Sequence, residues 1–598
     1  MESKVLKKRE EIQEQDKWSI NEIYSNDEVW EKEYKELQEE APKLKEFEGK
    51  LGDGETLIRY FEVNEKVSRK AEKIYVYAHL RCDEDTSNTK YQAMMNKIDA
   101  YMAEYATYTA YVVPEILSLP DGTIEKQMEE LKGLEPYKFL LENILKEKPH
   151  VLDKKEEELL AAASDCLDAP SSIHNIMTNA DMKFGNIKDE DGEEVELTEG
   201  NYSSFIKSKD REVRKEAFKG LFKEYKAFEN TLATTLSSSI KVFNFGARVR
   251  NYNSALEASL KPNDIPLEVY TNAIKTIDDN LSSLHRYVGL KKKLLGLDEM
   301  HMYDLYVPVI EIPKERVEFD DAVKMAIEGL QPLGKEYLDI FQEGINGGWI
   351  DKYINKGKRG GAYSWGGYDT KPYVLLNYNY ELNDVSTLVH EMGHSIHSYY
   401  SRKEQSYYYA GYTLFCAEVA STTNEALLIH HLINKETDKK KKLYLINQEL
   451  EQIRTTVFRQ LMFAEFELYT HESFEKGIPL TAEDYNAKWH ELNVKYFGPE
   501  MVVDYEIDVE WSRIPHFYSD FYVYQYATGY AAASAFAKSI LNKEPNAVEK
   551  YVGFLKSGGS DYPIEILKKA GVDMTTPKPL EATIDRFNEL LDMLEKEI

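Results

Sequence analysis

Cysteine is nearly absent from this chain. Only three cysteines occur in 598 residues, Cys82, Cys166 and Cys416. Three are too few for the disulfide framework that stabilises small secreted domains, and they fit a reducing compartment. The charged residues 1–10 also lack the apolar core of a signal peptide. We therefore expect a cytoplasmic protein.

Long apolar runs and flexible linkers are missing as well. No stretch approaches the roughly 18 consecutive apolar residues of a membrane-spanning helix. The 31 glycines and 19 prolines are thinly spread, and no low-complexity segment divides the chain. At 42% hydrophobic residues, the chain can build a large core.

Positive charge is scarce relative to negative charge. The chain has 75 Lys and Arg against 105 Asp and Glu, a formal net charge of −30. A protein this acidic is poorly suited to bind nucleic acid or an anionic membrane. We expect neither as a partner, and the sequence does not indicate the oligomeric state.

Helical periodicity dominates the sequence. Charged and apolar residues alternate at helical spacing in six long segments, 28–47, 93–117, 154–163, 211–241, 267–294 and 582–596. Strand signals are few. Residues 182–187 and 194–197 flank Asp191-Gly192 and predict a hairpin, and residues 303–310 and 373–378 are expected to pair in a small β-sheet. The sequence predicts a mostly α-helical protein, with an N-terminal helical region at 1–195 and a catalytic region at 196–598.

The most informative segment is His390-Glu391-Met392-Gly393-His394. Two imidazoles four residues apart lie on one face of a helix, where both can reach one metal ion. Glu391 lies about 100° round the helix, so it can face a metal-bound water without becoming a ligand. With 13 histidines in 598 residues, a chance match is rare. The segment predicts a zinc hydrolase site with a Lewis acid, a water and a base.

A strand precedes this helix. Residues 373–378 are rich in β-forming side chains, and Asn383 and Asp384 are good N-cap candidates. An exposed strand edge can hold an extended peptide by main-chain bonds. The residues that we assign to substrate binding open the strand: Tyr373, Val374 and Leu375. Glycine pairs at 360–361 and 366–367 mark either a mobile loop or an ordinary turn.

Two histidines leave the metal site incomplete, because catalytic zinc usually keeps three protein ligands. Residues 414–428 look helical and mostly buried. An ionised Glu418 there would be costly without a partner, and zinc would supply one. Glu425, two turns further along, is a rival ligand that we prefer as a partner holding an imidazole. His397 is another rival, although on a continuous helix it lies about 10 Å along the axis from His390.

Taken together, these segments resemble oligoendopeptidase F, in the thimet oligopeptidase family of zinc metallopeptidases. The resemblance rests on residues 390–394, on residues 417–421 at the family's third-ligand position, on residues 18–24 and on a C-terminal aromatic stretch. It covers nearly the whole chain. It implies an ellipsoid of two helical lobes around a deep channel, one Zn²⁺ per chain at the channel floor, and oligopeptide substrates.

The C-terminal aromatic stretch, residues 514–529, contains one histidine and four tyrosines. An aromatic core segment would explain it simply. A Tyr hydroxyl or His N–H aimed at the tetrahedral oxyanion would also lower the barrier to peptide hydrolysis. The resemblance gives this role to His516, Tyr518 and Tyr526. Because the loop is shorter than in the mammalian relatives, the other two tyrosines stay open, Tyr522 and Tyr524.

The predicted function is hydrolysis of internal peptide bonds in short peptides. His390, His394 and Glu418 bind Zn²⁺, which lowers the pKa of its water toward about 7. Glu391 takes the proton as general base and delivers it to the leaving amine. A zinc exopeptidase that removes dipeptides from a free C-terminus is the alternative. A second alternative is a helical protein that binds peptides without cleaving them. The intact histidines and glutamate argue against it. An acidic channel would favour basic peptides.

Overall fold

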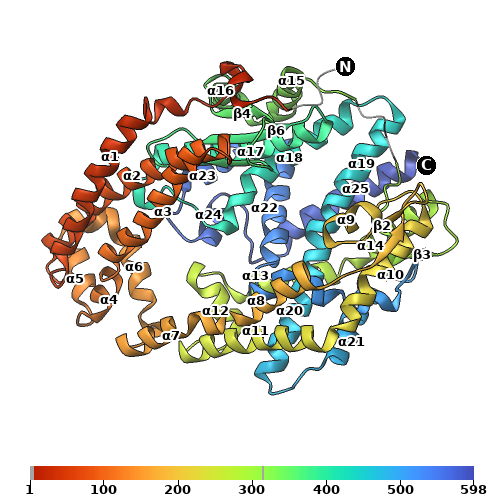
Figure 1. Cartoon of the computed structure of the whole chain (residues 1–598), viewed down its shortest axis with the longest axis horizontal. Helices are drawn as coiled ribbons and strands as arrows, with labels where there is room; N and C mark the ends of the chain where they lie inside the picture. The colour runs from red at the N-terminus through yellow and green to blue at the C-terminus, as the bar shows by residue number, and fades with distance from the viewer. Residues whose placement is uncertain (1–5, 311, 313–314, 598) are drawn as a thin grey trace. The chain divides into compact units, whose positions relative to one another are not determined.

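The computed structural model describes residues 6–310, 312 and 315–597 (Figure 1). These residues form 25 α-helices and seven short strands, so the predicted mostly α-helical fold is confirmed. None of the described helices is both long and apolar enough to cross a membrane.

The helices group into two compact units, each built from three stretches of chain. Unit 1 comprises Met1–Lys148, Lys314–His431 and Phe536–Gly571, and unit 2 comprises Pro149–Pro313, Leu432–Ala535 and Val572–Ile598. The division of the chain at residue 195 stays a prediction, as does the channel.

Unit 1 holds the first six helices, most of α18 and the helices around them. They are α1 (Asp27–Glu40), α2 (Gly54–Glu84), α3 (Thr89–Thr109), α4 (Val112–Ser118), α5 (Thr123–Glu130), α6 (Lys138–Lys146), α15 (Phe319–Leu330), α16 (Gly334–Asn346), α17 (Leu382–Glu404), α18 (Leu414–Lys435), α23 (Ala547–Ser557) and α24 (Pro563–Lys569). Helices α1, α2 and α3 pack side by side at one end of this unit (Figure 1). Polar caps fix where they begin: Asn26 accepts hydrogen bonds from two main-chain N–H groups of α1, and Asp53 accepts one from Thr56 of α2.

Unit 1 also contains a three-stranded sheet in the order β4-β6-β5. The middle strand, β6 (Tyr373–Tyr378), runs parallel to β4 (Ile350–Tyr353) and antiparallel to β5 (Tyr363–Trp365). Helix α17 packs against β5 and β6. The small sheet therefore lies directly beside the helix that carries the histidine motif.

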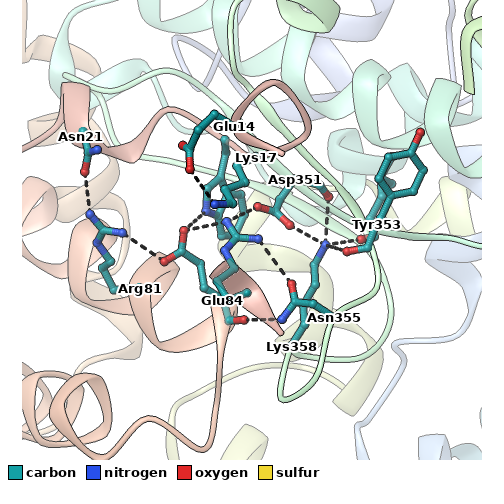
Figure 2. A network of polar contacts seen from close by, with 12 residues as sticks. Glu14, Lys17, Asn21, Arg81, Glu84, Asp351, Tyr353, Asn355 and Lys358 are labelled. Atoms are coloured by element: carbon teal, nitrogen blue, oxygen red, sulfur yellow. Dashed lines mark hydrogen bonds and ion pairs between the residues drawn. The ribbon is translucent and has the colours of Figure 1, made fainter. Parts of the chain in front are cut away.

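A buried polar network ties the N-terminal segment to α2 and β4 (Figure 2). Arg9 donates hydrogen bonds to Glu84 (2.8 Å) and to Asp351. The side chain of Lys358 is fully buried. Its ammonium lies 2.6 Å from Asp351 and donates to three main-chain oxygens of β4 and β6 at 2.6 to 3.1 Å. Because Lys358 lies five residues before β5, the network fixes the segment that leads into that strand.

Unit 2 holds the remaining helices. They are α7 (Lys154–Leu167), α8 (Ala169–Ile176), α9 (Glu199–Phe205), α10 (Arg211–Ala227), α11 (Glu229–Val249), α12 (Ala255–Leu260), α13 (Leu267–Asp278), α14 (Leu281–Leu294), α19 (Lys439–Ile453), α20 (Arg459–Glu475), α21 (Ala482–Phe497), the first part of α22 (Tyr524–Leu541) and α25 (Lys578–Glu597). Phe466 of α20 packs on Trp489 of α21 with ring centroids 4.9 Å apart, and on Phe517 at 5.2 Å. This aromatic core holds the 3₁₀ turn Pro515–Tyr518 in place.

The strand predictions for unit 2 have mixed outcomes. The hairpin is confirmed, as β1 (Asn186–Lys188) pairs antiparallel with β2 (Glu194–Glu196). The prediction of a strand at 303–310 is wrong. No strand occurs within the described residues 303–310; the nearby strand β3 (Met300–His301) ends before this segment and pairs with β7 (Met501–Val502). The chain then enters the 3₁₀ turn Met302–Asp304, because Asp304 is held by arginines 211 and 214 of α10.

Candidate metal centre

Helix α17 presents the two motif histidines on one face. It begins at Leu382, about two turns before the first histidine, with Glu381 at the N-cap. The expected caps Asn383 and Asp384 lie inside the first turn, where Asp384 accepts a hydrogen bond from the main chain of Glu381 at 2.9 Å. The helix is unbroken through Glu404, and the rings of His390 and His394 have centroids 4.9 Å apart.

Gly393 lets α18 approach this face closely. A Cβ atom at Gly393 would lie 2.6 Å from Cα of Ser421 and 2.9 Å from the main-chain oxygen of Ala420. No side chain fits that space, so only glycine permits the helix contact. Buried Asn424 of α18 holds it by donating to the main-chain oxygen of Val389 at 3.0 Å. Sequence reasoning missed both residues, although a glycine inside a helix is itself a signal of close packing.

The helix contact brings three ligand atoms together. Oε2 of Glu418 lies 3.5 Å from Nε2 of His390 and 3.6 Å from Nε2 of His394. All three atoms lie within 4.8 Å of one another, and no other such group occurs among the described residues. Ligands about 2.1 Å from a tetrahedral Zn²⁺ lie about 3.4 Å apart. The donor set and its spacing therefore fit one zinc ion.

Glu418 reaches this position for a different reason than the sequence indicated. Phe415, Cys416, Val419 and Ala420 around it are buried, but the Glu418 side chain is 45% exposed. The expectation that a buried carboxylate needed a partner there is wrong. The packing of α18 on α17 places Glu418, because its side chain projects beside the two imidazoles.

Glu425 contacts the other nitrogen of the first histidine. Its Oε2 accepts a hydrogen bond from Nδ1 of His390 at 3.1 Å, and its Oε1 accepts one from Ser386 at 3.0 Å. Burial lowers the pKa of His390, but this bond and the charges of Glu425, Glu391 and Glu418 outweigh it and raise the pKa to about 9. Burial lowers the pKa of His394 to about 4. The contact directs Nε2 of His390 toward Glu418.

His397, the other rival ligand, lies outside the group of three donors. Its ring is buried and stacks on Tyr412 with centroids 3.7 Å apart. Burial, with the charge of His394 adding, lowers its pKa to about 3. His397 is therefore a neutral side chain of the helix core.

Glu391 lies on the side of α17 that faces β5. It is 7% exposed, and the main-chain N–H of Ser364 in β5 lies close enough to its carboxylate to stabilise the charged form. Burial raises the pKa of Glu391 to about 7; Glu418 and Glu425 add to the rise, whereas His390 and Ser364 oppose it. A carboxyl group with such a pKa can both accept and return a proton near neutral pH.

The strand assigned to substrate is the middle strand of its sheet. Tyr373, Val374 and Leu375 are buried, and β6 is paired on both sides. The assumption that this strand offers an exposed edge is therefore wrong. The outer strand next to Glu391 is β5, and Ser364 at its centre was not singled out from the sequence.

The aromatic stretch belongs to unit 2 and forms a cluster of its own. The hydroxyl of Tyr526 lies 3.4 Å from Nε2 of His516. The Tyr522 ring packs edge-on to Tyr526, with centroids 5.4 Å apart. Burial lowers the pKa of His516, so its ring is neutral and keeps one N–H at pH 7. We call these three residues the His–Tyr cluster.

The other two tyrosines of the stretch point elsewhere in unit 2. The hydroxyls of Tyr518 and Thr235 lie 2.8 Å apart, and the Tyr518 ring packs on His174 with centroids 4.4 Å apart. Tyr524 packs on Tyr270 at 5.0 Å. The structure thus brings His516 together with Tyr526 and Tyr522, and not with Tyr518.

Known proteins resemble this chain along its whole length. The model of peptidase family M3 matches residues 204–586, and that of oligopeptidase F matches residues 115–184. Oligopeptidase PepF of Bacillus subtilis is 49% identical over 592 residues, covering 99% of this chain and 88% of PepF.

Two solved structures share the fold. One from Chlamydophila abortus has a TM-score of 0.96 at 38% identity and covers 99% of this chain and 100% of its own. Oligoendopeptidase-F from Enterococcus faecium has a TM-score of 0.72 at 40% identity, covering 96% and 99%. The chain therefore belongs to peptidase family M3 and is a metallo-oligopeptidase of the oligoendopeptidase F type.

Proposed function

We propose that the protein is a zinc-dependent endopeptidase that cleaves internal bonds of short peptides. The observation that carries this proposal is the convergence of His390, His394 and Glu418 beside the buried Glu391. These three ligands would hold one Zn²⁺ per chain, which would supply a Lewis acid and an acidified water. The relatives named oligopeptidases support the limit to short peptides.

In this proposal the base and its supports have separate tasks. A carboxylate oxygen of Glu391 accepts a proton from the attacking water and later gives it to the nitrogen of the leaving amine. Glu425 holds His390 in the tautomer that directs Nε2 toward the metal. Glu418 completes the ligand set.

We assign stabilisation of the oxyanion to His516 and Tyr526, with Tyr522 as the alternative tyrosine. The 3.4 Å contact between His516 and Tyr526 supports a shared task. Tyr518 is not assigned this role, because its hydroxyl lies against Thr235. An N–H or O–H donor aimed at the developing negative charge lowers the barrier.

We further propose that the substrate main chain aligns along β5 rather than β6. Strand β5 is the outer strand of the sheet, and its Ser364 contacts Glu391. A peptide added at that edge would gain main-chain hydrogen bonds without a sequence requirement. The small sheet would then set the orientation of the scissile bond.

Mass spectrometry of products from peptides blocked at both ends tests the function. We expect internal cleavage that a chelator abolishes and added Zn²⁺ restores. Release of dipeptides only from peptides with a free C-terminus would instead indicate an exopeptidase. Cleavage that continues in chelator would contradict the metal site.

The cytoplasm is the compartment that we propose. All three cysteines are free thiols, and one of them, Cys166, is exposed. An exposed thiol is stable in a reducing environment. Cell fractionation with an antibody to the protein checks this, and recovery outside the cytoplasmic fraction would contradict it.

A further inference from the structure

The turn that joins His516 to Tyr526 has an unusual conformation. Phe521, between the 3₁₀ turn Pro515–Tyr518 and α22, has a φ of +59°. Bulky side chains rarely adopt this left-handed region, which favours glycine and asparagine. The surroundings must therefore hold residues 519–523, the Phe521 turn, in this shape.

A buried glutamate contacts the strained residue directly. Oε1 of Glu467, on α20, accepts a hydrogen bond of 2.6 Å from the main-chain N–H of Phe521. Glu467 is only 2% exposed. The Phe521 ring is buried beside it, between His471 at 4.5 Å and Tyr270 at 5.6 Å.

The preceding residue of the turn is anchored as well. The main-chain oxygen of Asp520 accepts a hydrogen bond from Ser259 at 3.2 Å, and its Oδ1 lies 3.5 Å from Nε2 of His471. Asn244 donates to the main-chain oxygen of Ile240, which fixes its amide orientation, and also to Nδ1 of His471 at 3.1 Å. Because Nδ1 of His471 accepts from Asn244, a ring hydrogen lies on Nε2, on the side of Asp520.

Glu467 differs from other buried glutamates of unit 2. Glu449 and Glu510 are each paired with an arginine, Arg586 and Arg459, at 2.7 Å. Glu467 has no ion pair among the described residues, and its second oxygen is buried without a hydrogen-bond partner there. Burial raises its pKa well above the usual range, and the charge of Asp520 adds to this. A buried carboxyl without a cation is costly, so its bond to the turn calls for an explanation.

We propose that Glu467 is a positioning residue that holds the Phe521 turn and thereby sets the geometry of His516 and Tyr526. The inference rests on the proposed function of that pair. Glu467 lies one turn before His471 on α20, so one face of one helix holds both residues of the turn. Displacement of a reacting group by about 1 Å can cost about 100-fold in rate.

Steady-state kinetics of Glu467→Met on a doubly blocked fluorogenic peptide test this role. We expect kcat to fall about 10- to 100-fold, with KM and zinc content unchanged. Glu467→Gln keeps an acceptor for Phe521, so it should restore most of the lost kcat. Glu465→Met is the matched control: it removes a carboxylate of the same helix that contacts Lys495 at 2.8 Å. An equal loss of kcat in Glu465→Met would overturn the proposal.

A double-mutant cycle separates positioning from general destabilisation. If Glu467 acts through Tyr526, Glu467→Met should lower kcat only about twofold when Tyr526 is already replaced by Phe. The full loss in that background would overturn the inference. If instead Tyr526→Phe and His516→Ala by themselves leave kcat unchanged, the proposed oxyanion role fails.

Hydrogen exchange tests the contact without reference to catalysis. We expect the amides of residues 517–523 to exchange at least about tenfold faster in Glu467→Met than in Glu465→Met, since a tenfold change corresponds to loss of one strong hydrogen bond. Equal exchange in the two variants would overturn the inference, whatever the outcome for Tyr526.

Discussion

The metal centre of unit 1 and the His–Tyr cluster of unit 2 are positioned in different ways. His390 and His394 project from one unbroken helix, and a second helix brings Glu418 beside them. His516 lies on a 3₁₀ turn and Tyr526 at the start of a helix, with a left-handed residue between them. Regular structure sets the first geometry. Side chains distant in sequence hold the second, so small changes should disturb it more easily.

In unit 1, replacement of the proposed base, Glu391, should have the largest effect on kcat. Glu391→Gln should lower kcat by about 10²- to 10⁴-fold, the usual contribution of a general base, without loss of zinc. Stopped assays on a doubly blocked peptide and metal analysis measure the two quantities. Glu404→Gln, at the end of the same helix, is the control and should keep its activity. Full activity of Glu391→Gln would show that another group is the base.

Tyr526→Phe tests the unit 2 cluster with a smaller expected loss. Removal of one oxyanion donor costs about 10²- to 10³-fold in kcat. Tyr518→Phe is the paired control. Its kcat should stay close to that of the unchanged protein, because the Tyr518 hydroxyl contacts Thr235. The reverse ranking in kcat measurements would return the assignment to Tyr518, which the resemblance named alongside Tyr526.

Glu425→Gln tests whether Glu425 supports His390 or binds the metal itself. The loss of a carboxylate behind a histidine ligand lowers metal affinity by about 10- to 100-fold. Competition with a chromophoric chelator measures this, with Glu404→Gln as reference. A complete loss of zinc would make Glu425 a ligand in place of Glu418.

The smallest effect concerns pH and the free energy of unfolding. Buried Glu467 has a raised pKa, so above its ordinary pKa of about 4.3 the unfolded chain releases this proton before the folded protein does. Its contribution to stability therefore falls as pH rises from 5 to 8. Glu467→Gln cannot ionise, so its melting temperature should fall less over this range. The titratable groups whose charges act with that of Glu467 are Asp520 and Tyr270. Equal slopes in the two proteins would contradict the predicted titration of Glu467.

Part of this site could be predicted from the sequence because helical spacing determines it. His390, Glu391 and His394 are four residues or fewer apart, so their relative placement follows from one helix. Glu418 was predicted through the resemblance, whereas the burial argument for it is wrong. The helix approach at Gly393 positions Glu418, and no local pattern encodes which helix packs there.

The rest depends on contacts that sequence periodicity does not contain. The order of the sheet places β6 in the middle and β5 beside Glu391, because β4 pairs with β6 and not with β5, the strand that follows it in sequence. Glu467 lies 54 residues from the turn that it contacts. The mostly α-helical fold could be predicted because amphipathic spacing is local. The prediction of a strand at 303–310 was wrong because ion pairs of two arginines with Asp304 impose a turn.

Zinc content measured with activity in Glu418→Ala tests the central claim most directly. We predict one zinc per chain in the unchanged protein, and loss of both zinc and peptidase activity in the variant, with Glu404→Ala keeping both. Glu418→Ala protein that retains one zinc per chain and cleaves peptides at the normal rate would contradict the account.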